Sequence, residues 1–152
     1  MSPSPNRFHQ DILLNLTGVF LEHLGKRPLG RIYFAPFDVF LTDLNVYQPD
    51  LVFISNSRKS ILTDQGLDGA PDLVVEILSP RTAKLDKGVK REIYARTGVE
   101  ELWLVDPERE HIQVYHLSKS ADVPDGTYSG KQKFGSPLLP GFKISVEKIF
   151  RQ

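Results

Sequence analysis

The first regular pattern of apolar positions lies near the start of the chain. Between positions 8 and 24 apolar residues recur every three or four places, which is the period of one helix face. These residues are Ile12, Leu13, Leu16, Val19, Phe20 and Leu24. Gly25 and Pro28 follow and are ordinary helix stop signals. The pattern predicts a first helix over residues 8–24.

Extended apolar runs dominate the next part of the chain. Residues 31–41 predict one long strand, or two short strands bent at Pro36. Residues 50–55 predict a short apolar strand. Residues 72–78 are almost continuously apolar, with one carboxylate inside, which is typical of a central strand covered on both faces. Residues 56–71 between them are polar and glycine-rich, so we expect them to cross the surface.

The second half of the chain alternates helical and extended patterns again. We expect a second helix over residues 83–97, closed by Gly98. Residues 101–106 and 111–117 predict two strands of a hairpin, and residues 137–150 predict a last strand and a helical turn. The order is helix, three strands, helix, strand and C-terminal strands. It predicts an α/β (α+β) fold with a mixed sheet flanked by helices.

Composition narrows the class of protein. The 152 residues fit one domain spanning 1–152, and the absence of cysteine excludes disulfides, thiolate nucleophiles and Cys-ligated zinc. With 19 basic and 19 acidic residues, the net charge of zero argues against a protein that coats nucleic acid non-specifically, although it allows a local basic patch. The polar start and the lack of a long apolar run indicate no export signal and no membrane span. We therefore expect a cytoplasmic protein.

Several common catalytic motifs are missing from the sequence. It has no phosphate-binding G-x-x-x-x-G-K-[ST] loop and no G-x-G-x-x-G, so a nucleotide cofactor has no support. It also lacks H-E-x-x-H and G-x-S-x-G, which argues against a zinc hydrolase and against a serine acyl-transfer enzyme.

Two strand carboxylates are the most informative polar residues. Asp50 opens one predicted strand, and Glu76 lies inside the apolar run VVEIL. A carboxylate there is costly to bury unless it is paired or binds a cation. If the two strands are neighbours, the carboxylates converge on one point with oxygens suited to Mg²⁺ or Mn²⁺, and the Ile77 carbonyl can supply a third ligand. The alternative is a Glu76 paired with a buried Lys or Arg, without metal.

The segment after Glu76 is strongly basic. From Lys84 the lysines recur every three residues and form one oblique stripe along the second helix. The stripe and its neighbours are Arg81, Lys84, Lys87, Lys90 and Arg91. A solvated charged face is one interpretation. The other is that one lysine reaches the carboxylates and orients a water or stabilises a phosphate, while its neighbours hold the DNA backbone.

Three segments carry a family resemblance. They are QPDLVFI, GAPDLVVEILSP and LDKGVKREIYARTGVEELWLVDPE. Together they resemble the Uma-type (Uma-two) restriction endonucleases, within the PD-(D/E)XK nuclease superfamily, and the resemblance covers nearly the whole chain. It implies a helix, three strands, a helix and a further strand, with one metal site at a fork in the sheet.

The resemblance also implies roles for individual residues. Asp50 matches the Asp of the PD half-motif and Glu76 matches the acidic member of the second half. The usual lysine two residues after the acid is Leu78 in this chain. Sub-families with a migrated lysine imply that Lys90 replaces it, with Lys84 and Lys87 as competitors.

Further positions match family patterns or neighbour the motif. His9 is either a contact to the metal water or a phosphate, or a satisfied core histidine. Asp38 is either a metal-site acid or a strand-end residue paired with a cation. Tyr94 lies one turn after Lys90 and can hydrogen-bond it, or is core. The remaining residues have structural interpretations: Asp72 starts a strand, Asp86 positions Lys90, Trp103 belongs to the core and Asp106 stops a strand.

The leading hypothesis is a metal-dependent endonuclease that hydrolyses phosphodiester bonds in DNA. Asp50 and Glu76 bind Mg²⁺ or Mn²⁺, and Lys90 assists. One alternative is an inactive nucleic-acid-binding or assembly module on the same scaffold, and another is a structural oligomer in which an internal lysine neutralises Glu76. A chain of this size usually needs a partner to cut both strands, so we expect a homodimer.

Overall fold

The structure is a computed structural model that describes residues 6–79 and 86–152. The helical elements are α1 (Arg7–Lys26), the 3₁₀-helix η1 (Asn56–Ile61), the π-helix η2 (Asp86–Lys90), α3 (Arg91–Thr97) and α4 (Val146–Ile149). The strands of the first half are β1 (Gly30–Phe34), β2 (Asp38–Thr42), β3 (Asn45–Tyr47), β4 (Leu51–Ser55), β5 (Leu62–Thr63), β6 (Gly66–Asp68) and β7 (Leu73–Ile77). Those of the second half are β8 (Glu101–Asp106), β9 (His111–His116), β10 (Gly126–Ser129), β11 (Lys133–Ser136) and β12 (Leu139–Ser145).

Helix α1 confirms the first predicted helix and extends it by a residue or two at each end. Asn6 caps it, because its side-chain oxygen accepts a hydrogen bond from the backbone N–H of His9 at 2.9 Å. The predicted apolar face is buried through Ile12, Leu16 and Phe20. The helix passes Gly25 and ends at Lys26, ahead of Pro28.

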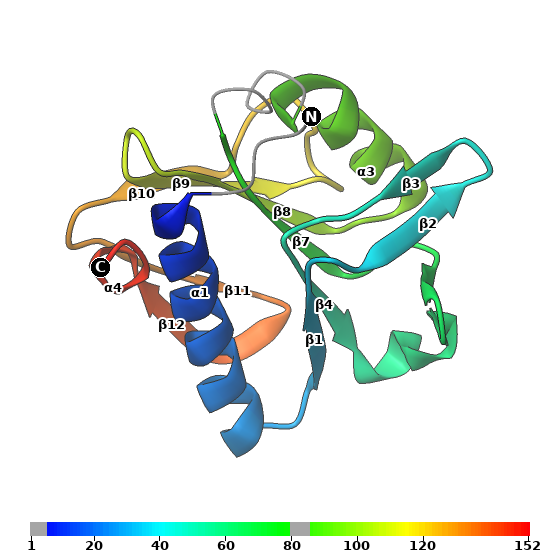
Figure 1. Ribbon diagram of the computed structural model, residues 1–152, viewed down its shortest axis with the longest axis horizontal. Helices are drawn as coiled ribbons and strands as arrows, with labels where there is room; N and C mark the ends of the chain where they lie inside the picture. The colour runs from blue at the N-terminus through cyan, green and yellow to red at the C-terminus, as the bar shows by residue number, and fades with distance from the viewer. Residues whose placement is uncertain (1–5, 80–85) are drawn as a thin grey trace.

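The main sheet has six strands in the order β1-β4-β7-β8-β9-β10. Only the β7–β8 pair is parallel, so the sheet is mixed, as predicted. Strand β7 lies between β4 and β8 and is buried along its length, which confirms residues 72–78 as a central strand. Helix α1 runs across one face of this sheet and α3 lies on the other side (Figure 1).

The alternation of side chains along the central strands divides the core into two layers. Leu51, Phe53 and Val75 face the layer that contains α1, while Val52 and Val74 face the layer that contains Tyr94 of α3. Glu76 follows Val75 and precedes Ile77, so strand periodicity places its side chain on the α3 side. The predicted acid therefore faces α3, which follows Lys90 and begins with Arg91.

Residues 31–41 form two strands rather than one. A turn at Pro36 separates β1, at the edge of the main sheet, from β2, which belongs to a second sheet of order β3-β2-β6-β5. The expectation that residues 56–71 only cross the surface is wrong in part. They contain η1, β5 and β6, and Leu67 of β6 is fully buried against the α3 layer.

The second half of the chain follows its predicted order. Strands β8 and β9 form the expected hairpin, and β12 with α4 forms the C-terminal strand and helical turn. Helix α3 ends at Thr97, and Gly98 caps it with a φ of 106°, as predicted. Of the expected helix over residues 83–97, residues 83–85 lie outside the described residues. Within residues 6–79 and 86–152, no helix has both the length and the apolar character needed to cross a membrane.

Candidate active site

Asp50 and the end of β7 lie side by side because of the strand register. Strand β4 runs antiparallel to β7, with Leu51 opposite Val75, so the residue before β4 lies beside the C-terminal end of β7. One carboxylate oxygen of Asp50, Oδ2, accepts a hydrogen bond from the backbone N–H of Ile77 at 2.7 Å. The register thus brings Asp50 next to the peptide that follows Glu76.

His9 reaches the same point from helix α1. Its Nε2 atom lies 3.3 Å from Oδ1 of Asp50, and 14% of the His9 side chain is exposed. The structure places this histidine beside the candidate metal ligand, a position that both interpretations of His9 allow. Asp50 is therefore held from two directions, by a histidine of α1 and by the backbone of β7.

Glu76 is bound by two side chains from the helical segment above it. The Tyr94 hydroxyl donates a hydrogen bond to Oε1 of Glu76 at 2.6 Å, and the Lys90 ammonium lies 3.4 Å from the same oxygen. Lys90 and Tyr94 are four residues apart, so both project from the same side of the helical segment. Glu76 is only 4% exposed, and a carboxylate so buried needs such partners.

Lys90 occupies an unusual backbone position. It is the last residue of the π-helix η2 and directly precedes α3. Short π-helical turns are rare and frequently occur at functional sites. Of the two competing lysines, Lys84 lies outside the described residues, as does the side chain of Lys87. Arg81 and the side chain of Asp86, which we expected to position Lys90, also lie outside them.

The Lys90–Glu76 contact fits two of the hypotheses. An ion pair without metal requires a buried lysine beside Glu76, and a nuclease site requires a lysine near the acidic ligand. Both interpretations predict this contact, which is observed at 3.4 Å. A measurement of metal binding distinguishes them, because only the nuclease site binds a divalent ion.

Arg91 and Asp38 have partners outside this cluster. The Arg91 guanidinium donates to the Tyr115 hydroxyl at 3.1 Å and lies 4.9 Å from the centre of the Tyr115 ring. Asp38 Oδ1 accepts a hydrogen bond from the Gln48 side chain at 2.8 Å. This hydrogen bond ties Asp38 to the segment that leads into Asp50, and the partner it provides is an amide rather than a cation.

The acids that we expected to be structural have structural contacts. Asp72 Oδ2 accepts the backbone N–H of Ser55 at 2.6 Å, and its Oδ1 accepts the Ser55 hydroxyl at 3.1 Å, which fastens the end of β4 to the start of β7. Asp106 accepts the backbone N–H groups of Glu108 and Arg109 and turns the chain after β8. Although burial acts to raise the pKa of Asp106, these hydrogen bonds and the Arg109 side chain lower it.

A buried carboxylate at the other end of β8 was not predicted. Glu101 is completely buried, accepts the indole N–H of Trp103 at 3.0 Å and lies 3.5 Å from Nδ1 of His116. Burial raises the pKa of Glu101, against the lowering effects of His116 and Trp103. In sequence Glu101 is an ordinary polar residue at the start of a strand, so only the sheet arrangement reveals its burial.

The donor set at Asp50 and Glu76 fits a hard divalent cation. Among residues 6–79 and 86–152, no group of three or more His, Cys, Asp and Glu side chains could hold a metal ion. Two carboxylates with a backbone carbonyl, such as that of Ile77, are nevertheless the partial shell that Mg²⁺ uses when water and substrate phosphate complete its coordination. The arrangement does not resemble a closed structural metal site.

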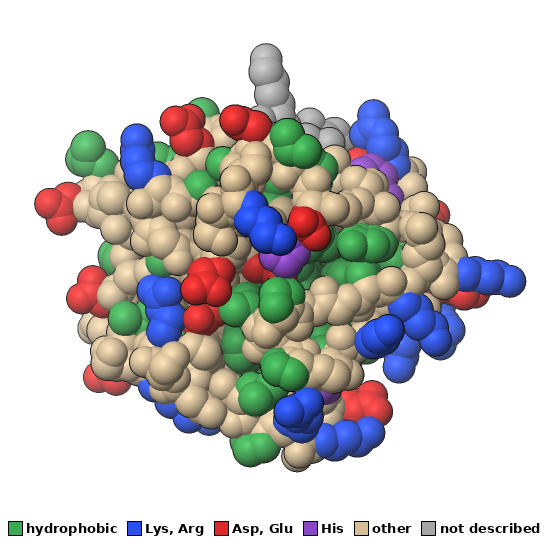
Figure 2. All heavy atoms as spheres, turned by 180° about the vertical axis from the view of Figure 1, so that it is seen from behind, with side chains coloured by type: hydrophobic (Ala, Val, Ile, Leu, Met, Phe, Trp, Pro, Cys, Tyr) green, Lys and Arg blue, Asp and Glu red, His purple; other side chains and the backbone are tan. Residues whose placement is uncertain are grey.

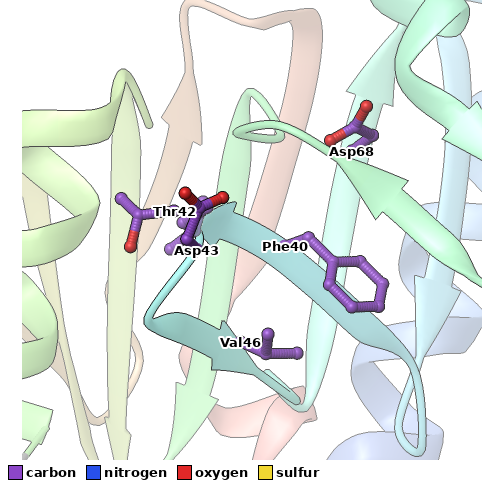
Figure 3. A pocket seen from close by; sticks show the side chains of 6 residues that line it. Phe40, Thr42, Asp43, Val46 and Asp68 are labelled. Carbon is purple, nitrogen blue, oxygen red and sulfur yellow. The ribbon is translucent and has the colours of Figure 1, made fainter.

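A pocket on the outer side of the second sheet differs from this site. Its volume is about 480 Å³, and Phe40, Leu41, Thr42, Asp43, Val46 and Asp68 line it (Figure 3). Two carboxylates at its rim disfavour a phosphate backbone. On the face seen in Figure 2, acidic and basic side chains are interspersed, which agrees with the net charge of zero.

Two comparisons with known proteins found similarity to proteins described as nucleases. The Uma2 family model, described as "Putative restriction endonuclease", matches residues 1–147. A crystal structure of a "putative nuclease belonging to DUF820" from Anabaena variabilis ATCC 29413 is similar over 99% of this chain and 84% of its own, with a TM-score of 0.80 and 18% identity. That identity supports a shared fold only. A comparison with curated proteins gave no match.

Proposed function

The chain belongs to the Uma2 family, and from that premise we propose that it is a metal-dependent endonuclease that hydrolyses phosphodiester bonds in DNA. One observation carries the proposal. Asp50 accepts a hydrogen bond from the N–H of Ile77, the residue after Glu76, and Lys90 contacts Glu76. Two carboxylates and a lysine at one end of a mixed sheet are the parts that phosphodiester hydrolysis requires.

We propose that Asp50, Glu76 and the Ile77 carbonyl hold Mg²⁺ or Mn²⁺. A bound divalent ion supplies charge stabilisation at the phosphate and lowers the pKa of a bound water. Hydrolysis then forms one bond from the water oxygen to phosphorus and breaks one phosphorus–ester bond. The water loses a proton and the leaving oxygen gains one, so no redox cofactor is needed.

The neighbouring side chains have separate roles in this proposal. Lys90 orients the attacking water or balances the charge that develops on the phosphate. Tyr94 fixes the Glu76 carboxylate, with its hydroxyl 2.6 Å from Oε1. His9 holds Asp50 from the side of α1, at 3.3 Å. The basic residues Arg81, Lys84, Lys87 and Arg91 contact the DNA backbone.

The test combines metal binding with plasmid nicking. Isothermal calorimetry with Mg²⁺ and with Mn²⁺ on the wild type should show binding, and Glu76→Gln should abolish it. Nicking of supercoiled plasmid should disappear in the same variant. Glu92→Gln is the matched control, because Glu92 is an exposed residue of α3 and its replacement removes the same charge.

Each outcome separates the three hypotheses. Binding and nicking that are both lost in Glu76→Gln, but kept in Glu92→Gln, support the nuclease. Metal binding without nicking on any DNA substrate identifies an inactive module. Absence of metal binding in the wild type makes Glu76 the partner of a structural ion pair and refutes the proposal.

Three broader expectations belong to the same proposal. The chain acts as a single nuclease-like domain over residues 1–152. It works in the cytoplasm, where DNA is available. It cleaves both strands as a homodimer, because one copy offers one site.

A further inference from the structure

Tyr47 contacts the candidate site from an element that carries none of its proposed ligands. It is the last residue of β3, in the second sheet, whereas the ligands come from β4, β7 and their ends. Its ring packs against the α3 layer of the core, among the residues around Tyr94. The sequence marks it only by its place three residues before Asp50.

The face of the Tyr47 ring is turned toward the Lys90 ammonium. Nζ of Lys90 lies 5.2 Å from the ring centre, within the distance at which a cation is attracted to an aromatic face. The Tyr94 ring packs against the Tyr47 ring in an edge-to-face arrangement, with 5.6 Å between the ring centres and 75° between the ring planes. The Tyr47 hydroxyl donates to the Asn45 side chain at 3.3 Å, so the ring and not the hydroxyl faces Lys90.

An aromatic face can add to the contacts that restrain a lysine. The lysine side chain has four rotatable bonds and loses much conformational freedom when it is fixed. The Lys90–Glu76 distance of 3.4 Å is at the long end for a hydrogen bond, so a further attraction on the ammonium strengthens its placement. The ring face adds attraction from another direction, and because only 17% of the Lys90 side chain is exposed, little water competes with it.

We propose that Tyr47 is a positioning residue whose ring holds the Lys90 ammonium against Glu76. The inference rests on the proposed nuclease function for its catalytic consequence. It makes the second sheet part of the active site, because the position of β3 sets the position of the ring. The simpler alternative is that Tyr47 only fills space beside Tyr94.

The experiment compares Tyr47→Phe with Tyr47→Leu, alone and combined with Lys90→Met. Phenylalanine keeps the aromatic face, and leucine keeps only apolar bulk. We expect Tyr47→Phe to nick plasmid at the wild-type rate. We expect Tyr47→Leu to lower kcat about 2- to 30-fold with KM unchanged, as the loss of a cation–π contact predicts. Tyr128→Leu is the control for loss of an aromatic ring elsewhere, since Tyr128 stacks on Phe134 in the other layer.

A second readout is independent of catalysis. The unfolding constants of wild type, Tyr47→Leu, Lys90→Met and the double variant form a cycle, in which the two changes should be coupled by about 2- to 30-fold. Coupling with no nicking in any variant supports the contact and refutes the nuclease proposal. Nicking by the wild type without coupling overturns the role of Tyr47 and leaves the nuclease proposal standing. The role of Tyr47 is also overturned if Tyr47→Phe lowers kcat as much as Tyr47→Leu does. It is likewise overturned if Tyr47→Leu lowers kcat equally in the wild-type and the Lys90→Met backgrounds.

Discussion

Replacing Tyr94 with phenylalanine removes a single oxygen atom from the candidate site. That oxygen donates to Glu76 at 2.6 Å, which is the range of a short hydrogen bond to an ionised carboxylate. Tyr94 is completely buried, and Glu76 is 4% exposed, so water cannot replace the lost donor without rearrangement. The ring itself is unchanged, and its packing against Tyr47 should persist.

The expected loss of stability follows from these contacts. A hydrogen bond to a charged group contributes about 1.5–3 kcal/mol to the free energy of unfolding. Lys90 remains beside the same oxygen, at 3.4 Å, and offsets part of the loss. We therefore expect Tyr94→Phe to lower the free energy of unfolding by about 2 kcal/mol, or to lower Tm by roughly 4–8 °C for a domain of this size. The variant should still fold, because typical stabilities are ~5–15 kcal/mol.

Urea denaturation without added metal measures this effect. The transition midpoint should fall while the m-value stays constant. Tyr33→Phe is the control, since Tyr33 is partly exposed on β1 and its ring stacks on Phe37. In a Glu76→Gln background the cost of Tyr94→Phe should shrink to that of a neutral hydrogen bond, about 1 kcal/mol. A loss below ~0.5 kcal/mol in the wild-type background would refute the assignment of a charged, buried hydrogen bond.

Two other acids give predictions of a different kind. Asp72→Asn should lower the free energy of unfolding by about 1–3 kcal/mol, because it weakens the acceptor of both Ser55 hydrogen bonds. Calorimetry of this variant should nevertheless show the metal affinity of the wild type. A changed affinity would mean that Asp72 belongs to the site. Burial raises the pKa of Glu101, so the native state keeps the carboxyl proton of Glu101 over a pH range in which the unfolded chain has lost it. The contribution of Glu101 to the free energy of unfolding therefore falls as the pH rises through that range. Glu101→Gln should remove this slope from denaturation curves measured between about pH 4 and 8, followed by the fluorescence of Trp103; an unchanged slope would contradict it.

The central elements were predictable because their patterns are unambiguous. Helix α1 has six apolar residues at helical spacing, and β7 is an apolar run too short for a helix and too regular for a loop. Asp50 and Glu76 stand out for the same reason, since each interrupts or opens an apolar strand. The spacing of Lys90 and Tyr94 also predicted a shared helix side, and both contact Glu76.

The second sheet was harder to foresee. Strands β3, β5 and β6 have only two or three residues each, too few to show alternation. The π-helix before α3 has no distinct sequence signal. Tyr47 acquires its contact with Lys90 from the way two sheets pack together, and a single sequence does not record which distant strands lie side by side.

The position of Glu76 on a strand paired along both edges has a consequence for local unfolding. Each amide of such a strand is hydrogen-bonded toward one neighbour and exchanges with solvent only when that ladder opens, and the ladders of a central strand open late in unfolding. The Ile77 N–H is further held by Asp50. The strand that carries Glu76 therefore stays in place through a partial opening at the sheet edges, whereas Lys90 and Tyr47 reach Glu76 from elements outside the main sheet.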